Sequence, residues 1–419
     1  MPLTSAEPIT APGATAPRPA PDEHRQWLTL PDCKRVLVVV HTLVYGLRLQ
    51  DVFPLLRTDL RVNVVFTVAP HQFNAGAADF LRSLGATVMP WREALRTDFD
   101  LALAAGSKGV EQIRGPLLRL PHGAGHVKLN HRPALGPDRT IGGIGRSYLT
   151  WEGRVVPAAV ALAHRSDLDE LARWCPEALP IAEVIGDGCY DRIAASLPLR
   201  ERYRRALGLR EGERLVLTTS TWGRASSFNR IDALLPRLLA ELPADRYRTA
   251  LLVHPNVWAG HGRWQVNGWL PERARESVHL LPPETDWRQL LIAADYLIGD
   301  HGSVSLYGAL TATPTLLARF PAARDLNPHS PGALLARTAP ALSLTHSLAE
   351  QLDYAEQRLR PEESAAIAER ISSEPGRFNH NVRALIYRLL GLGEPAHAPS
   401  DDPLPLPTAL DDHEPGRLR

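Results

Sequence analysis

Apolar residues of this chain follow two alternating patterns from residue 35 onward. Short runs that are apolar almost without interruption are separated by longer segments in which apolar positions recur every three to four residues. Uninterrupted runs predict strands buried on both faces, and the longer spacing predicts amphipathic helices. Such a series is typical of a parallel sheet covered by helices. In the first half, the predicted strands are residues 35–40, 62–68, 86–89, 99–105 and 116–120, and the predicted helices are residues 43–57 and 75–84.

A second series of the same kind starts at residue 214. Its predicted strands are residues 214–221, 248–255, 278–281, 296–300 and 313–318, with helices that include residues 231–242 and 287–294. The chain therefore predicts an α/β fold of two Rossmann-like domains, whose parallel sheets face a cleft. Between the two series, residues 197–212 are charged and helical without a strand pattern, so we place the connection between the domains there.

The two ends of the chain differ in composition from the rest. The first residues are rich in proline and alanine, and the last ones are similar, which predicts disordered termini. Helical segments at 347–359 and 361–390 come after the second sheet is complete, and we expect them to brace the first domain. The predicted organisation is a disordered arm at 1–32, an N-terminal domain at 33–200, a C-terminal domain at 201–345, bracing helices at 346–393 and a disordered tail at 394–419.

The overall charge is nearly balanced, with 47 Lys and Arg against 46 Asp and Glu and a net charge of +1. This balance argues against a nonspecific nucleic-acid binder, which needs a one-sided basic surface. The cysteines, Cys33, Cys175 and Cys189, lack metal-ligand spacing and fit reduced thiols in a reducing cytosol. No apolar run approaches the roughly 20 residues of a membrane span. We therefore expect a cytoplasmic location, with peripheral contact at the inner face of the membrane left open.

Polar clusters follow three of the predicted strands. The carboxyl ends of strands in two facing sheets converge on the cleft between them, so we expect these clusters to meet there. A single histidine at a strand end is more often a hydrogen-bonded loop residue than a catalyst, which makes the common placement more informative than the composition. The clusters are His122 with Gly123; His254 with Pro255; and Asp300, His301, Gly302 and Ser303.

The third cluster has the features of a phosphate-binding turn. The apolar run at 296–299 ends at Asp300, and a helical pattern begins directly afterwards. Gly302 leaves room for a ligand close to the backbone, and Ser303 or Asp300 can cap the helix. The free amides of a helix N-terminus favour a phosphate or diphosphate, although an ordinary capped turn remains the alternative. A further polar loop at a strand end contains Thr219, Ser220 and Thr221.

His122 is the candidate general base. An imidazole has an unperturbed pKa near ~6.5, so a useful fraction is unprotonated at neutral pH and can accept a proton from a hydroxyl. Gly123 lets an acceptor approach closely, and Lys128 and His126 are the candidates for contact with the acceptor or with a phosphate. The pair His122 and His126 could bind zinc only on a helix, which the intervening glycines disfavour, so no metal is expected.

Several common site motifs are missing from the sequence. There is no G-x-x-x-x-G-K-[ST] phosphate loop, and the glycine cluster I-G-G-I-G-R-S does not follow the first strand as a dinucleotide fingerprint would. The G-x-S-x-G motif of serine hydrolases is also missing. Walker-type NTPases and ordinary NAD dehydrogenases are therefore disfavoured, and no cofactor is expected.

In order and spacing, the motifs across residues 115–320 resemble the CDP-glycerol glycerophosphotransferase family, teichoic-acid polymerases of the GT-B architecture, and more distantly UDP-N-acetylglucosamine 2-epimerases. The resemblance implies that the His122 loop carries the catalytic base and that His254 with Pro255 helps to hold the donor diphosphate. It also implies that the turn from Asp300 to Val304 grips the donor phosphates. His301 and Gly302 stand where that family has Tyr and Ser, which leaves the identity of the donor open.

The resemblance implies a metal-independent transferase that moves a glycerophosphate or related group from a nucleotide-diphosphate donor, such as CDP-glycerol, to an acceptor hydroxyl in cell-wall polymer synthesis. The first domain would then present the acceptor, which could be lipid-linked, and the second would bind the donor. Two alternatives stay open. One is a nucleotide-sugar glycosyltransferase or 2-epimerase-like enzyme, and the other is a non-catalytic nucleotide-binding or regulatory protein with the same fold.

Overall fold

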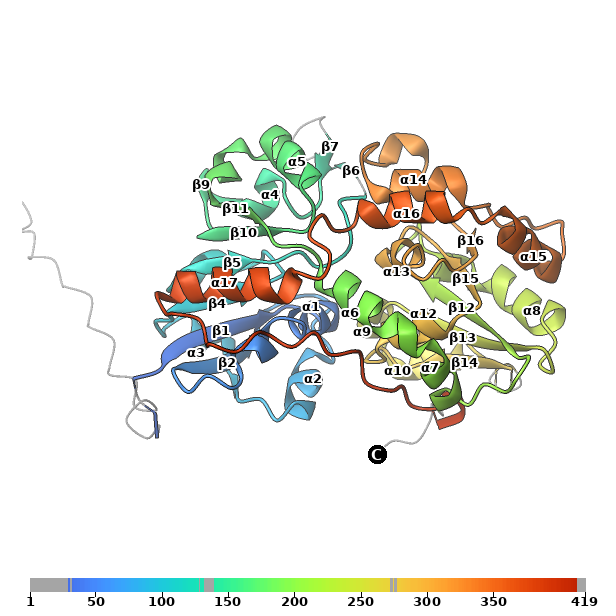
Figure 1. Ribbon diagram of the computed structural model, residues 1–419, viewed down its shortest axis with the longest axis horizontal. Helices are drawn as coiled ribbons and strands as arrows, with labels where there is room; N and C mark the ends of the chain where they lie inside the picture. The colour runs from blue at the N-terminus through green and yellow to red at the C-terminus, as the bar shows by residue number, and fades with distance from the viewer. Residues whose placement is uncertain are drawn as a thin grey trace, which may run out of the picture.

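A computed structural model describes residues 29–30, 32–127, 129–131, 139–271, 274 and 277–412. Two parallel sheets lie side by side, each covered by helices, and the chain crosses between them more than once (Figure 1). The predicted N-terminal arm, 1–32, lies almost wholly outside the described residues. The predicted α/β fold with two Rossmann-like domains is confirmed.

The first sheet has seven strands in the order β11-β10-β5-β4-β1-β2-β3. All its neighbouring strands pair in parallel, and β1 pairs with β2 from Lys34 with Val62 to Val40 with Val68. Its strands are β1 (Lys34–Val40), β2 (Val62–Val68), β3 (Val88–Met89), β4 (Leu101–Ala104), β5 (Leu117–Arg119), β10 (Ala159–Leu162) and β11 (Ala182–Val184). Two short antiparallel hairpins interrupt the series, β6 (Leu129–His131) with β7 (Arg139–Ile141) and β8 (Thr150–Trp151) with β9 (Arg154–Val155).

The second sheet has five parallel strands in the order β14-β13-β12-β15-β16. They are β12 (Arg214–Ser220), β13 (Tyr247–Val253), β14 (Val278–Leu281), β15 (Tyr296–Gly299) and β16 (Thr315–Leu317). Every strand predicted from an uninterrupted apolar run is found in one of the two sheets. The pattern predicts such strands because a parallel strand covered by helices buries the side chains on both of its faces. In β15, for example, all four residues are buried.

Helices cover the faces of both sheets. In the first domain they are α1 (Leu43–Leu49), α2 (Ala77–Ser83), α3 (Trp91–Ala94), α4 (Arg146–Leu149) and α5 (Ser166–Trp174). The second domain contributes α8 (Ile231–Glu241), α9 (Pro255–His261), α10 (Arg263–Gly268), α12 (Trp287–Ala293), α13 (Ser303–Tyr307), α14 (Pro331–Thr338), α15 (Leu348–Arg358) and α16 (Pro361–Glu369). The helix predicted at 43–57 is broken into α1 and a 3₁₀ turn at Phe53–Leu56, because Pro54 lacks the N–H that a continuous helix requires.

The last helical segment crosses back to the first domain, as predicted. Residues 361–390 form two helices rather than one. The first, α16, ends at Glu369, and Pro375 and Gly376, which has φ +71°, keep the chain non-helical until α17 (Phe378–Leu390) begins. Val382 and Ile386 of α17 are fully buried in the core of the first sheet. Figure 1 shows α17 lying across that sheet, while α16 stays with the second domain.

The connection between the domains lies earlier than the predicted segment 197–212. Two helices of that region, α6 (Gly188–Ser196) and α7 (Arg200–Ala206), already pack in the core of the second domain, where Ile193 and Tyr203 are fully buried. The chain therefore crosses directly after β11. The charged residues of α7 reflect its solvated face, and a charged amphipathic helix cannot be told from a linker by composition alone.

The predicted disordered tail is wrong for residues 394–412, while 413–419 lie outside the described residues. This segment returns from α17 along the molecule to α7 (Figure 1). Leu404 and Leu410 are 3% and 1% exposed in the second core. The Leu404 amide donates to Ser196 Oγ at 2.9 Å, and the Tyr203 hydroxyl donates to the Leu404 carbonyl at 2.5 Å. Two leucines among prolines carry no periodic signal, so their burial could not be predicted.

Candidate active site

The candidate site lies where strand order reverses in each sheet. In the first sheet the reversal falls between β1 and β4, and in the second between β12 and β15. Open α/β sheets bind ligands outside the carboxyl ends of their strands at such reversal points. His41 follows β1 and Gly106 lies shortly after β4, while Thr221 follows β12 and Asp300 follows β15. Of the predicted clusters, the Asp300 turn lies at such a reversal point, whereas His122 follows the neighbouring strand β5 and His254 follows the neighbouring strand β13.

The His122 loop of the first domain touches the turn at Ser303 of the second. A Cβ atom placed on Gly123 would lie 3.1 Å from Ser303 Oγ, and one placed on Gly125 would lie 2.8 Å from Pro331 Cγ. The Asn327 amide donates to the Val127 carbonyl at 2.9 Å beside this contact. Two clusters that are 180 residues apart in sequence thus meet across the domain boundary, and glycine is what allows the close approach.

His122 is exposed to solvent, although both domains surround it. Its ring lies 5.1 Å from the Tyr45 ring, between centroids. Enclosure within the protein lowers the pKa of His122, and electrostatic interactions with Arg119, His126, Arg48 and His254 lower it further. At neutral pH the imidazole is therefore uncharged and able to accept a proton.

This environment predicts the pH dependence of turnover. A base with a lowered pKa stays unprotonated to lower pH, so the acid limb of kcat/KM should have its midpoint below the ordinary histidine value of about 6.5. The measurement is a kcat/KM profile from pH 4 to 9 with an identified donor and acceptor. A midpoint at or above that value, in a profile free of acid unfolding, would contradict the assignment.

His254 faces its own helix with one nitrogen. Its Nδ1 accepts a hydrogen bond of 3.0 Å from the Asn256 amide, and Pro255 occupies the first position of α9. Burial lowers the pKa of His254 to about 4, against the opposing effect of Asp300, so the ring is neutral at pH 7. A neutral ring that accepts at Nδ1 carries its proton on Nε2. His254 is thus fixed as a donor, the role that phosphate oxygens require.

Asp300 supports the turn instead of facing a ligand. Its side chain is almost fully buried and accepts from the Thr221 amide and hydroxyl at 2.9 and 2.8 Å, from the Ser227 amide at 2.9 Å and from the Gly302 amide at 3.0 Å. The carboxylate therefore holds the loops after β12 and β15 together. A ligand phosphate would find these oxygens already engaged.

Other residues of the predicted donor set also lie behind the turn. His301 is 7% exposed, contacts Thr221 Oγ1 at 3.3 Å through Nε2 and packs edge-on against Phe320. Thr219 and Ser220 are buried, and Ser220 Oγ accepts from the Phe228 amide at 2.8 Å. These three side chains stabilise the loop, which leaves the accessible part of the turn to Thr221, Gly302, Ser303 and Val304.

Two glycines shape the turn. A Cβ atom on Gly299 would lie 2.2 Å from Ser305 Oγ, and one on Gly302 would lie 2.6 Å from Thr221 Cγ2. The helix that follows, α13, has only five residues, so it contributes little dipole and the local amides matter more. The first amides of a helix have no partner within it, which makes those of Ser303 and Val304 the donors available at this turn.

The structure describes only one of the two first-domain residues, His126 and Lys128, that were predicted to contact the acceptor. His126 is engaged within its own domain, with Nδ1 at 2.7 Å from the Gly142 carbonyl and Nε2 at 3.9 Å from Asp167 Oδ1. Its ring also packs on Gly143, so His126 stabilises the loop and does not face a ligand. Lys128 lies outside the described residues. Over the described ranges, no group of three or more His, Cys, Asp and Glu side chains is placed to hold a metal ion.

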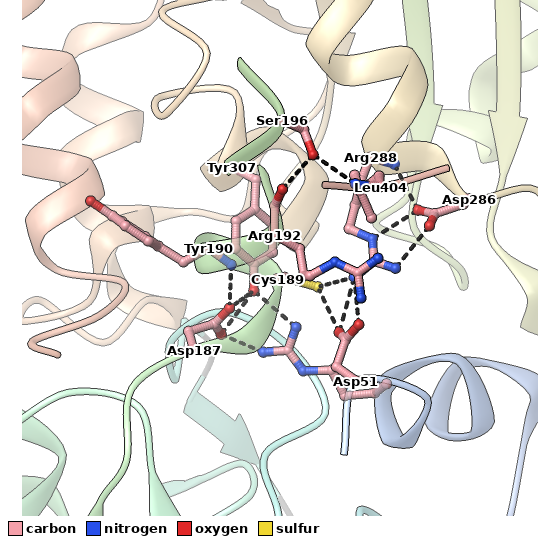
Figure 2. Close-up of polar contacts among 11 residues, drawn as sticks. Asp51, Asp187, Cys189, Tyr190, Arg192, Ser196, Asp286, Arg288, Tyr307 and Leu404 are labelled. Atoms are coloured by element: carbon pink, nitrogen blue, oxygen red, sulfur yellow. Dashed lines mark hydrogen bonds and ion pairs between the residues drawn. The ribbon is translucent and has the colours of Figure 1, made fainter. Parts of the chain in front are cut away.

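Sequence reasoning did not predict the ion pairs that join the domains. Arg48 of α1 forms an ion pair with Asp187 and donates to the Tyr307 hydroxyl at 3.2 Å, while that hydroxyl donates to Asp187 at 2.9 Å. Beside it, Arg288 Nη1 lies 2.9 and 3.0 Å from the two oxygens of Asp51. Figure 2 shows both sets side by side, drawn from both domains and from α6. No local sequence pattern marks these pairs, since each partner is distant in sequence.

Tyr45 and His41 were also missed, although a signal existed. Both follow the first strand, at the same edge of the sheet as His122. His41 is fully buried, and its Nε2 donates to the Lys108 carbonyl at 2.8 Å. Applying the strand-end rule to β1 would have found them.

Comparison with known proteins shows that this chain is similar to solved structures in its fold. No protein-family model matches the chain, and no curated protein matches it in sequence. Among solved structures, the wall teichoic acid polymerase TagF aligns with a TM-score of 0.54 at 14% identity, covering 85% of this chain and 89% of that one. A TagF variant soaked with CDPG aligns with a TM-score of 0.55 at 12% identity, covering 87% and 90%.

A second kind of structure also aligns. The S. aureus MnaA–UDP co-structure has a TM-score of 0.51 at 12% identity, covering 85% of this chain and 97% of that one. Sequence identities this low support a shared fold only, so the chemistry has to be argued from the residues of the site. Among the described residues, no helix is both long enough and apolar enough to span a membrane. Two facing parallel sheets, braced by a helix that crosses back, and these alignments show that the chain has the GT-B fold.

Proposed function

We propose that this protein is a transferase that uses a nucleotide-diphosphate donor and moves a glycerophosphate or related group to an acceptor hydroxyl. The observation that carries the proposal is the contact between the His122 loop and the Ser303 turn, at the converging strand ends of the two sheets. A neutral imidazole on one side and a set of hydrogen-bond donors on the other are the parts that such a transfer needs.

In this proposal, the acceptor oxygen attacks the β-phosphorus of the donor. A bond forms between them, the bond from that phosphorus to the bridging oxygen breaks, and the nucleotide leaves as its monophosphate. His122 takes the proton of the attacking hydroxyl. Negative charge that grows on the diphosphate is stabilised by the Nε2–H of His254 and by the amides of Ser303 and Val304.

A second candidate keeps the site and changes the bond that breaks. In a nucleotide-sugar glycosyltransferase, the acceptor oxygen attacks the anomeric carbon, the bond from that carbon to the diphosphate oxygen breaks, and the nucleotide leaves as its diphosphate. In an epimerase-like enzyme, the product is still a nucleotide sugar, and no nucleotide is released overall. The MnaA alignment and the replacement of a Tyr-Ser pair by His301 and Gly302 favour keeping this candidate. The two transfer reactions differ in one product, a nucleoside monophosphate or a nucleoside diphosphate, whereas an epimerase-like reaction gives an isomerised nucleotide sugar.

The test is a donor screen followed by product analysis. A correct donor stabilises the folded protein by mass action, so CDP-glycerol should raise Tm more than UDP-N-acetylglucosamine or CDP alone, and its turnover should release CMP. Gly302→Ala, whose Cβ would meet Thr221, should abolish the Tm shift. Gly268→Ala on α10 is the matched control, since nothing lies within 4 Å of its added carbon, and it should keep the shift.

Three outcomes separate the candidates. Release of UDP from a nucleotide sugar would favour the glycosyl-transfer candidate. A Tm shift with neither release of a nucleotide, over a panel of hydroxyl acceptors, nor isomerisation of a bound nucleotide sugar would favour the non-catalytic nucleotide-binding protein. A donor that shifts Tm equally in Gly302→Ala would place the nucleotide elsewhere and contradict the proposed seat.

A further inference from the structure

A cavity of about 240 Å³ opens in the first domain next to the candidate active site. It is lined by residues that follow β4, by residues of β5, and by the β8–β9 region of the first domain. Its polar lining includes Ser107, Lys108, Glu111, Arg119, Ser147 and Tyr148. The proposed donor seat, which belongs to the second domain, takes no part in this cavity.

Arg119 at the cavity wall is buried, and no carboxylate of the described residues forms an ion pair with it. Its residue is 4% exposed, its Nη1 reaches only the Ala104 carbonyl at 3.4 Å, and its Nε has no hydrogen-bond partner. By contrast, the buried Arg48 and Arg288 are each paired with an aspartate. A buried charge without a counter-ion is costly, so an arginine that lines a cavity in this state is suited to an anion from outside.

The other polar groups around Arg119 fit the same chemistry. Ser147 Oγ is buried without a hydrogen-bond partner, and Lys108 is exposed at the cavity lining. Glu111 is the carboxylate of the polar lining, and it accepts from Gln112 at 3.2 Å, with no ion pair to Arg119 among the described residues. Burial lowers the pKa of Arg119 to about 10, which still leaves it charged at neutral pH.

The cavity is also coupled to the proposed base. Arg119 is three residues before His122, and its charge lowers the pKa of His122 and of His41. His41 in turn holds the Lys108 loop through the 2.8 Å hydrogen bond to the Lys108 carbonyl. A group bound at Arg119 would therefore lie on the first-domain side of the cleft, within electrostatic reach of His122.

We propose that this cavity binds a phosphate group of the acceptor, held by Arg119 and Lys108 with the hydroxyl of Ser147. The proposal rests on the proposed function, in which the first domain presents the acceptor. A planar guanidinium presents paired donors to phosphate oxygens, and Lys108 adds a second charge. A phosphorylated acceptor would thus be anchored beside the base, with its free hydroxyl left for the reaction.

Binding of glycerol 3-phosphate tests the proposal, with glycerol as the neutral control ligand. Calorimetry should show binding to the wild type and a loss of about tenfold or more in Arg119→Met, as expected when a charged hydrogen bond is removed. Arg114→Met is the matched control, since Arg114 is exposed three residues before the strand that holds Arg119 and does not line the cavity. It should bind within about twofold of the wild type.

A second variant and a second measurement keep the test decisive. Ser147→Ala should weaken glycerol 3-phosphate binding without opening a void, and Arg119→Met should melt no lower than the wild type, because it removes an unpaired buried charge. A phosphatidic acid arm in phosphatidylcholine vesicles separates the two sources of phosphate. If only the vesicles bind, and binding depends on Arg119, the ligand of the cavity is a lipid phosphate. If glycerol 3-phosphate binds, the ligand is a soluble phosphate.

The failure of this proposal can be told from the failure of the proposed function. Equal phosphate binding by the wild type and Arg119→Met, or no binding in either arm, would overturn the subsite. Nucleotide-diphosphate binding, measured on the same proteins, should stay within about twofold in every variant, because the donor seat lies in the other domain. Normal donor binding with lost phosphate binding supports the subsite, and lost donor binding in Arg119→Met would contradict it.

Discussion

His122→Ala should lower turnover by about 10²–10⁴-fold, the usual contribution of a positioned general base. The imidazole is uncharged at neutral pH because its surroundings lower its pKa, and it lies at the contact between the two domains. Donor affinity should change little, since the donor contacts are assigned to His254 and the Ser303 turn. The measurement is a steady-state rate with the donor identified by the screen, together with the donor Kd.

Two controls make this result specific to His122. His380→Ala removes an exposed histidine of α17 and should leave turnover within about twofold of the wild type. Added imidazole should restore part of the rate in His122→Ala, because the truncation leaves room for a free base. Turnover of His122→Ala close to that of the wild type would show that another group accepts the proton.

Asp187→Ala should have the largest effect on stability, about 3–5 kcal/mol, which is typical of breaking a buried ion pair by removing one partner. The Asp187 side chain is fully buried, whereas that of Arg48 is 11% exposed, so the substitution leaves a guanidinium without its counter-ion. It also removes the acceptor for the Tyr307 hydroxyl and the cap of α6, where Asp187 accepts from the Tyr190 amide at 2.8 Å. Urea denaturation measures the loss.

Matched variants separate the charge from the other contacts. Tyr307→Phe removes the hydrogen bonds of the hydroxyl with Asp187 and Arg48 but keeps the ion pair, so it should cost only about 1–2 kcal/mol. Asp79→Ala breaks an exposed pair with Arg82 and should have little measurable effect. The double variant Arg48→Met with Asp187→Leu should recover most of the loss. A small effect of Asp187→Ala would mean that water reaches Arg48 and that the pair does not fasten the domains.

The same network explains why the cleft keeps its geometry. Arg48 and Asp51 belong to the first domain, Tyr307 and Arg288 belong to the second, and Asp187 begins the helix that connects them. Buried ion pairs need close geometry to offset the desolvation of their charges, so they specify one arrangement of the two sheets. The rings of Phe73 and Trp222, 5.2 Å apart between centroids, add a contact from one domain to the other.

Local patterns were enough to predict the two sheets and the loops of the site. A covered parallel strand must be apolar on both faces, so uninterrupted runs marked all the strands named in advance, and the carboxyl ends of those strands marked the His122, His254 and Ser303 loops. Helix breaks were less visible. Pro54 and the pair Pro375 and Gly376 divided segments that had been predicted as continuous.

The sequence by itself determined the fold class, the position of most strands of the two sheets and the loops that carry the candidate chemistry, because all of these depend on neighbouring residues. Only the tertiary structure decided which of those side chains face a ligand. Asp300 and His301 turned out to be buried supports, and Arg119 a buried cation that forms no ion pair among the described residues. It also decided the joint between domains, since Arg48 and Asp187 are 139 residues apart and long-range pairing leaves no periodic trace along the chain.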